Sequence, residues 1–153
     1  MNQQPAASAL LQAALRRRLI SVKEAMALRH VLAGCGDDPQ AVRQRLSHGP
    51  GQISAETNRD LLALLPDAQA PAIESYRRLA QLGSGRLATS WLGLGQIGLV
   101  VIKELHASLV PQPEIFIDDI QPLLGGGHRY LVPYLTVTRS ADGGVALVQH
   151  YRQ

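Results

Sequence analysis

The chain has 153 residues, of which 46% are hydrophobic and 18% are charged, so it carries enough apolar material for one ordinary domain or two small ones. Its formal net charge of +3 is mild and its basic residues are spread along the chain, which argues against nucleic-acid binding from charge alone. The single cysteine, Cys35, excludes an intramolecular disulfide and fits a reducing compartment.

Signals for membranes, secretion and metals are weak. No stretch approaches the roughly 20 apolar residues that cross a bilayer. The basic run at 16–18 follows the apolar part of the N-terminal segment, which is the reverse of a secretory signal. We therefore expect no membrane partner, and a cytoplasmic protein or the cytoplasmic fragment of a longer one. The 5 histidines show no metal-ligand spacing, so no metal site is predicted.

The first 66 residues predict four helices. The first, Ser8–Leu19, places its leucines near one face. Each later helix follows a side chain that can accept a hydrogen bond from a free amide of the first turn: Ser21 (with Glu24 completing a capping box), Asp38 (before Pro39) and Ser54. Glycine or proline ends each of these three helices: Gly34, Gly49 and Pro66.

A faint repeat links residues 19–22 and 52–55, each of which leads into a capped helix. Two helix-turn-helix units stacked as a small bundle over residues 1–66 would bury the leucines. Helix-turn-helix units also bind DNA, but the candidate second helices carry few basic residues: Lys23 and Arg29 in one, Arg59 in the other. A protein-docking or regulatory module is therefore the favoured role, and nucleic acid is the less favoured partner.

A proline- and alanine-rich linker at 67–74 marks the expected domain boundary. Beyond it, alternating apolar patterns between glycine turns predict five antiparallel strands: Tyr76–Leu82, Leu87–Leu94, Leu99–Glu104, Tyr130–Thr138 and Val145–Tyr151. A helix at Glu114–Leu124, which Pro122 distorts, lies between the third strand and the fourth. The expected fold class is α+β, with a small helical bundle followed by a five-stranded sheet and one helix.

Two features of the sheet region indicate a phosphate site. Gly83 and Gly85 lack a Cβ atom, so the turn that contains them can bring its backbone amides close to a phosphate. Lys103 ends the apolar run at 99–102, and a lone positive charge in such a place favours an anionic ligand. A glycine turn alone is weak evidence, since it is also common in simple hairpins.

Taken in order, these landmarks resemble the small N-terminal lobe of a bacterial serine/threonine protein kinase or pseudokinase. Gly83–Ala88 stands where that family has its G-x-G-x-x-G loop, with Ala88 in place of the third glycine. Val100-Val101-Ile102-Lys103 stands where the family has V-A-I-K. The segment at 128–134 is similar to the one that leads into the fourth strand of the lobe, and 145–151 is similar to its fifth strand and hinge.

The resemblance implies that this region binds ATP, with magnesium only when a large lobe is present. It assigns Lys103 to the α- and β-phosphates and Asp119 to the helix carboxylate that pairs with the lysine, with Asp118 as the runner-up. The other implied site residues are those of the loop over the phosphates (Gly83, Ser84, Gly85 and Ala88), those against adenine (Ser90 and Val101), the gatekeeper Gln149, and the hinge positions His150 and Arg152.

Several residues depart from the family pattern. Aspartate at 119 is one methylene shorter than the usual glutamate, Ser90 replaces a valine, and Val101 replaces a smaller alanine. These changes predict weak nucleotide binding or a pseudokinase. The sequence has no H-R-D or D-F-G motif, so this chain alone is predicted not to catalyse phosphoryl transfer, and the large lobe or another protein is the expected partner.

Three hypotheses from different classes therefore remain. The chain is the nucleotide-binding lobe of a kinase-like protein, either naturally truncated or a fragment. Alternatively, it is a non-catalytic pseudokinase-type interaction module, or a small helical DNA-binding or adaptor protein with a β appendage. A nucleotide-dependent gain in thermal stability would separate the first hypothesis from the other two.

Overall fold

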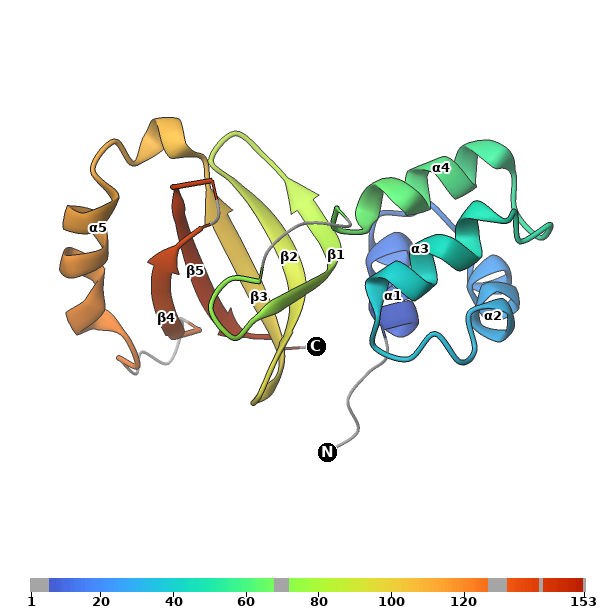
Figure 1. Cartoon of the computed structure of the whole chain (residues 1–153), viewed down its shortest axis with the longest axis horizontal. Helices are drawn as coiled ribbons and strands as arrows, with labels where there is room; N and C mark the ends of the chain where they lie inside the picture. The colour runs from blue at the N-terminus through green and yellow to red at the C-terminus, as the bar shows by residue number, and fades with distance from the viewer. Residues whose placement is uncertain (1–5, 68–71, 127–131, 141, 153) are drawn as a thin grey trace. The chain divides into compact units, whose positions relative to one another are not determined.

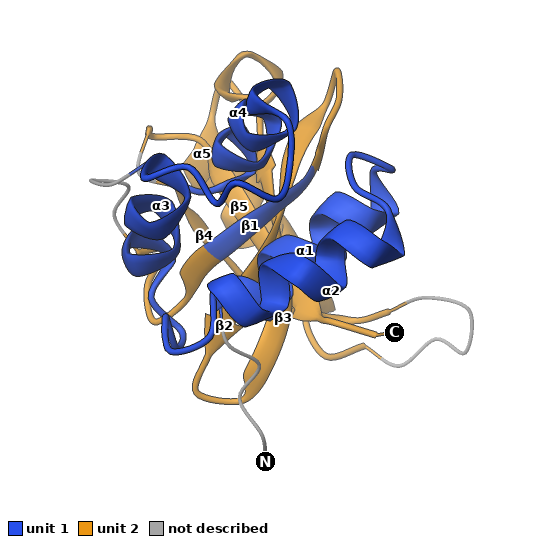
Figure 2. Ribbon diagram, turned by 90° about the vertical axis from the view of Figure 1, so that its right-hand side faces the viewer, with its two compact units in different colours: residues 1–69, 79–82 blue, residues 70–78, 83–153 orange. Residues whose placement is uncertain are grey.

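A computed structural model of the chain describes residues 6–67, 72–126, 132–140 and 142–152. The fold is α+β, as expected from the sequence: four helices precede a five-stranded antiparallel sheet that carries a fifth helix (Figure 1). The chain divides into two compact units, residues 1–69 with 79–82 and residues 70–78 with 83–153 (Figure 2). The expected linker at 67–74 falls partly outside the described residues, because 68–71 are not among them.

Three of the four N-terminal helices begin after the cap residues that the sequence indicates, and the first begins at Ala6, two residues before the predicted Ser8. Their bounds are α1 Ala6–Arg16, α2 Val22–Val31, α3 Pro39–Ser47 and α4 Ala55–Leu64. Ser21 and Glu24 form the full capping box, since the Glu24 amide donates to Ser21 Oγ (3.2 Å) and the Ser21 amide donates to Glu24 Oε2 (2.8 Å). Asp38 Oδ1 accepts from the Gln40 amide (2.9 Å). The first helix ends earlier than predicted, at Arg16.

Leucines fill the interior of the helical unit. Helix α1 packs against α2, α3 and α4, so it is the central helix of this unit. The fully buried leucines come from the faces that the sequence pattern predicts: Leu10, Leu28, Leu32, Leu46, Leu61 and Leu64. Burying each such side chain contributes about 1.5–3 kcal/mol, so these residues hold the unit together.

The sheet has the order β1-β2-β3-β5-β4, in which β5 lies between β3 and β4. Its strands are β1 Arg77–Ser84, β2 Ala88–Gly95, β3 Gly98–Leu105, β4 Tyr134–Arg139 and β5 Val145–His150. Between β3 and β4 the chain forms the short 3₁₀ helix η1 Ala107–Leu109, then α5 Pro113–Ile120 and η2 Gln121–Leu123.

Two prolines account for the main differences from the predicted boundaries. The helix predicted at Glu114–Leu124 is α-helical only to Ile120, because Pro122 has no N–H to donate and the chain continues as a 3₁₀ turn. The described part of the predicted fourth strand is extended from Tyr134, directly after Pro133. The first part of that predicted strand, with most of the segment at 128–134, lies outside the described residues.

The strand register sorts the side chains onto two faces of the sheet. We call one of them the lysine face, which carries Ser90, Val101, Lys103, Leu147 and Gln149 through the pairs Ser90↔Lys103, Lys103↔Leu147 and Val101↔Gln149. Helix α5 covers one end of this face, where its side chains pack on Val137, Val145 and Leu147. The opposite face carries a second apolar cluster: Ile73, Val100, Ile102, Ala146 and Val148.

Candidate functional site

The lysine face brings together four of the residues that the sequence assigns to a nucleotide site. Ser90, Val101, Lys103 and Gln149 come from three neighbouring strands, and their register places all four on one side of the sheet. Each of the four is half-buried, so their side chains lie at the surface and not in the core. Because directly paired residues of antiparallel strands lie side by side, these four form a continuous row of possible ligand contacts.

A cavity of 440 Å³ lies beside this row. Lys103, Gln149 and Tyr134 line it from the sheet. Its other walls come from the helical segment and the approach to β4: Ile120, Leu123, Leu124, Gly126, Val132 and Pro133. Mostly apolar walls with a few convergent polar groups are typical of small-molecule sites, and this cavity lies within the usual size range.

The lysine amine lies near an aromatic ring and has no carboxylate partner among the described residues. Lys103 Nζ is 5.9 Å from the centre of the Tyr134 ring, at the outer limit of a cation–π contact. Asp119 and Asp118, the two predicted partners, are exposed on α5, and no ion pair joins either of them to Lys103 in the described ranges. The structure therefore does not bring the predicted lysine–carboxylate pair together.

Helix α5 instead uses its first carboxylate to bind β4. Glu114 forms an ion pair with Arg139, and the hydrogen bond from the guanidinium lowers the pKa of the Glu114 carboxyl. Phe116, Ile117 and Ile120 form the stripe of α5 that packs on the sheet. Sequence reasoning missed Glu114, although an acidic residue in the first turn of a helix was a usable signal.

The glycine loop is a tight hairpin between β1 and β2. Gly83 and Ser84 end β1 and Ala88 begins β2, so only Gly85, Arg86 and Leu87 lie between the strands. The Gly85 amide donates to the Ala88 carbonyl (3.0 Å). A Cβ atom added at Gly83 or Gly85 would meet nothing within 4 Å, and neither residue has a left-handed φ. The fold of this chain therefore does not itself require glycine at these two positions.

His106 holds this loop from the end of β3. Its ring Nε2 lies 2.8 Å from the Gly85 carbonyl oxygen, and its backbone amide donates to the Leu87 carbonyl (3.1 Å). Sequence reasoning missed both His106 and Tyr134. The local sequence around His106 does not indicate its role, because its hydrogen-bond partner, Gly85, lies 21 residues earlier in the chain.

The predicted hinge positions lie at the end of β5. Gln149 faces the cavity, whereas the side chains of His150 and Arg152 are exposed. The Tyr151 amide donates to the Leu99 carbonyl (3.2 Å), which extends the pairing of β5 with β3 beyond the last residue of the strand. The backbone next to His150 is thus ordered against β3.

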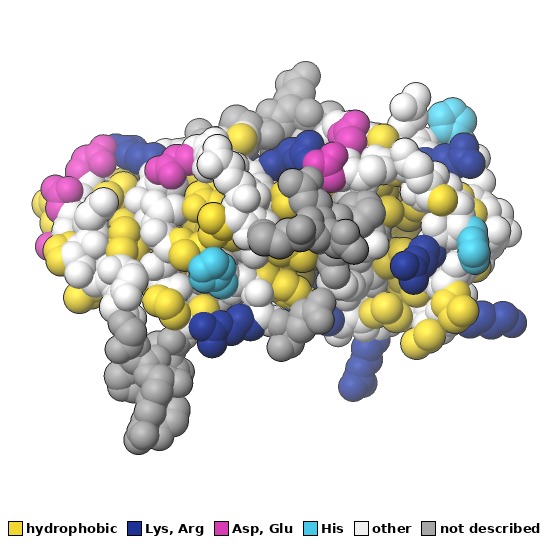
Figure 3. All heavy atoms as spheres, turned by 90° about the horizontal axis from the view of Figure 1, so that it is seen from below, with side chains coloured by type: hydrophobic (Ala, Val, Ile, Leu, Met, Phe, Trp, Pro, Cys, Tyr) yellow, Lys and Arg dark blue, Asp and Glu magenta, His cyan; other side chains and the backbone are white. Residues whose placement is uncertain are grey.

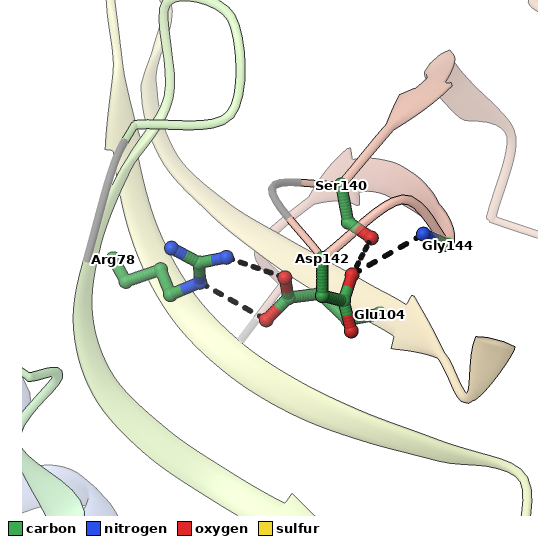
Figure 4. A network of polar contacts seen from close by, with 5 residues as sticks. All are labelled: Arg78, Glu104, Ser140, Asp142 and Gly144. Carbon is green, nitrogen blue, oxygen red and sulfur yellow. Dashed lines mark hydrogen bonds and ion pairs between the residues drawn. The ribbon is translucent and has the colours of Figure 1, made fainter.

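The opposite face of the sheet holds a polar network that is separate from the cavity (Figure 4). Arg78, only 8% exposed, forms a two-pronged ion pair with Glu104, in which Nε donates to Oε2 at 3.0 Å. Nearby, Asp142 accepts hydrogen bonds from the Ser140 hydroxyl and the Gly144 amide. The Ser140 hydroxyl is the main cause that lowers the Asp142 pKa. This network ties β1 to β3 and orders the β4–β5 turn.

The described residues show neither a metal-binding group nor a membrane-spanning helix. No group of three or more His, Cys, Asp or Glu side chains there is placed to hold a metal ion. On the face drawn in Figure 3, the Lys and Arg side chains of each unit lie apart and form no continuous patch. None of the described helices is long and apolar enough to cross a membrane.

The site thus belongs to an α+β domain in which Lys103 lies beside a cavity on one face of a five-stranded sheet. Among solved structures, the chain is similar to the kinase domain of PknI from Mycobacterium tuberculosis, with 16% sequence identity and a TM-score of 0.46. The match covers 56% of this chain and 36% of that kinase domain. No protein-family model matches the sequence, and no curated protein matches it.

Proposed function

We propose that residues 75–153 bind ATP on the lysine face, as the small lobe of a kinase-like protein does. The observation that supports this proposal is the register that sets Ser90, Val101, Lys103 and Gln149 in one row beside the 440 Å³ cavity. The row offers a positive charge for phosphate at Lys103 and an uncharged surface for a base around Val101. The proposal is confined to binding, because the 153 residues contain no H-R-D or D-F-G motif.

The charge of Lys103 favours an anionic ligand. The half-buried ammonium group has an aromatic ring near it, but no described carboxylate pairs with it. Phosphate oxygens would give it the charge-assisted hydrogen bonds that a tyrosine ring does not supply.

The open space at the two glycines supports a ligand near the loop. Since no atom of the described residues fills the position of a Cβ at Gly83 or Gly85, the lack of a side chain there leaves room for a ligand to approach the backbone. The amides of Arg86 and Leu87 have no acceptor among the described residues. Two neighbouring amides at an exposed turn are suitable donors to phosphate oxygens.

We expect the affinity to be low. Ser90 loses apolar contact with the base worth up to about 1–2 kcal/mol relative to valine. Because Asp119 is exposed, Lys103 has no partner among the described carboxylates that would orient it. Millimolar ATP is available in a reducing cytoplasm, the compartment that fits the single cysteine, Cys35.

Thermal unfolding in the presence of Mg·ATP tests the proposal. For a dissociation constant of about 1 mM, roughly 5 mM nucleotide stabilises the protein by about 1 kcal/mol, or about 2–4 °C in Tm. Lys103→Met should abolish this shift, whereas Lys23→Met in helix α2 should retain it. The absence of a shift in the wild type, or an equal shift in the Lys103 variant, would contradict the proposal.

A second candidate function is a protein-interaction module without nucleotide. The observation that favours it is the exposure of two large apolar side chains in the helical segment between β3 and β4: Ile115 is 56% exposed, and Leu123, which lines the cavity, is 67% exposed. Self-association through this surface would bury them. Sedimentation analysis should then show a dimer that Leu123→Glu converts to a monomer, and a wild type that stays monomeric at high concentration would exclude this form of the interaction.

A further inference from the structure

His106 makes three hydrogen bonds that join separate segments of the sheet unit. Its ring Nε2 and its backbone amide bind the carbonyl groups of Gly85 and Leu87, at 2.8 and 3.1 Å. Its own carbonyl accepts from the Leu109 amide at 2.9 Å, within the turn that leads to α5. One residue at the end of β3 thus contacts both the glycine loop and the approach to the helix.

The contact between the His106 ring and the Gly85 carbonyl shows which ring nitrogen carries a proton. A carbonyl oxygen can only accept a hydrogen bond, so Nε2 of His106 must carry the proton that it donates to Gly85. Phenylalanine would keep the size of the ring but would lose this donor. Glutamine has a side-chain N–H₂ group of similar reach and would keep the donor without the ring.

The two carbonyl contacts also determine where the loop amides point. In a trans peptide the carbonyl and the following N–H point in opposite directions. Because the Gly85 carbonyl points at His106, the Arg86 amide points away from it. The Leu87 carbonyl is likewise directed at His106, which turns the Ala88 amide away.

Packing does little to hold the tip of this loop. Leu87 is 61% exposed, Arg86 is exposed, and the sites of a Cβ at Gly83 and Gly85 are empty. Hydrogen bonds are therefore the main restraint on its position. The ring of His106 supplies the one side-chain contact to the loop backbone that is seen among the described residues.

We propose that His106 is a positioning residue that fixes the direction of the loop amides and links the loop to the segment before α5. This inference rests on the proposed nucleotide binding at the lysine face, because the Arg86 amide, which the contact to the Gly85 carbonyl orients, is one of the two amides that would meet the phosphates. The restraint itself is a property of the free protein and can be measured without nucleotide.

Amide hydrogen exchange in the full chain tests the restraint directly. In His106→Phe, exchange of the Gly85 amide should become about three- to tenfold faster, as expected for the loss of one hydrogen bond. His106→Gln should restore the rate to within about twofold of the wild type. His48→Phe removes a ring hydrogen bond to the Gln44 carbonyl in helix α3 and serves as the matched control that leaves the loop unchanged.

Two exchange results would overturn the inference. One is an unchanged Gly85 rate in His106→Phe, and the other is a faster rate that His106→Gln does not restore, since the ring and not its N–H would then matter. Far-ultraviolet circular dichroism of each variant checks that the sheet is intact. If His106→Phe does not fold, the wild-type and His106→Gln rates still decide the question, because a glutamine variant with a loosened loop contradicts the proposal.

Nucleotide titration of the same variants separates this inference from the proposed function. A matching three- to tenfold loss of Mg·ATP affinity in His106→Phe, with recovery in His106→Gln, supports both. A loosened loop with unchanged affinity overturns the role of His106 in binding and leaves the nucleotide site standing. If the His106 variants show the expected exchange rates but the wild type binds no nucleotide, the restraint is supported and the proposed function is refuted.

Discussion

Removing one partner of the Arg78–Glu104 pair should destabilise the sheet unit strongly. Arg78 is 8% exposed and the Glu104 side chain 17% exposed, so each charge would be left in a poorly hydrated place without its partner. Breaking a buried ion pair in this way costs about 3–5 kcal/mol. We expect about 4 kcal/mol for Arg78→Met, which leaves Glu104 uncompensated. Glu104→Gln should cost less, about 2–3 kcal/mol, because Asp142 still exerts a favourable Coulombic interaction with Arg78.

The double variant Arg78→Met with Glu104→Leu distinguishes the loss of a partner from the loss of packing. Replacing both charges with apolar groups of similar volume is often close to neutral, so the double variant should be more stable than Arg78→Met alone by about 2 kcal/mol or more. If the costs of the single variants Arg78→Met and Glu104→Leu simply add in the double variant, the reasoning is refuted, since the two charges would then contribute independently.

Urea unfolding followed by tryptophan fluorescence is a suitable assay for this cycle. The chain has 1 tryptophan, Trp91, which packs against the core of the opposite face. Its ring centre is 5.8 Å from the Arg78 guanidinium. The signal therefore reports the sheet unit and not the helices. An unchanged m-value would show that the variants alter stability and not the extent of unfolding.

Two further predictions concern a helix cap and a turn carboxylate. Ser54→Ala should destabilise the helical unit by about 1 kcal/mol in thermal unfolding followed by circular dichroism, because Ser54 Oγ accepts from the Thr57 amide at 3.0 Å. Ser47→Ala is the matched control, since its hydroxyl only donates to the Arg43 carbonyl within α3, and an equal loss in both variants would contradict a capping effect. The hydrogen bond from Ser140 lowers the pKa of Asp142 in the folded protein. The ionised Asp142 carboxylate therefore contributes stability at pH values above its unfolded-state pKa, near 3.8. This stability is lost as the pH falls through the lower folded-state pKa. Asp142→Asn should therefore be less stable than the wild type at neutral pH, with the difference shrinking below about pH 4, and a difference that stays constant down to pH 2 would refute this assignment.

Local signals in the sequence predicted the helix starts well. A capping box or an N-cap aspartate acts through hydrogen bonds that span two or three residues, as the contacts of Ser21, Glu24 and Asp38 show. The alternation of apolar residues and the glycine turns likewise placed β1, β2, β3 and β5 to within about two residues. The row on the lysine face follows from the same alternation, because residues two apart on a strand share a side of the sheet.

Contacts between distant segments could not be predicted from such signals. Arg78 and Glu104 are 26 residues apart, and only the pairing of β1, β2 and β3 brings their side chains together. Counting along the chain suggested Asp119 as the partner of Lys103, but α5 packs with Phe116, Ile117 and Ile120 toward the sheet. Because these three side chains face the sheet, the carboxylate of Asp119 is exposed.

The position of β5 between β3 and β4 bears on the order of folding events. Strands β1, β2 and β3 are neighbours both along the chain and in the sheet, so they can form early as a local meander. Strand β5 must find β3 across the whole α5 segment, with Leu147 pairing with Lys103, and closing so long a loop is slow. The cavity wall formed by Gln149 and Tyr134 would then form last, when the β4–β5 hairpin pairs with β3.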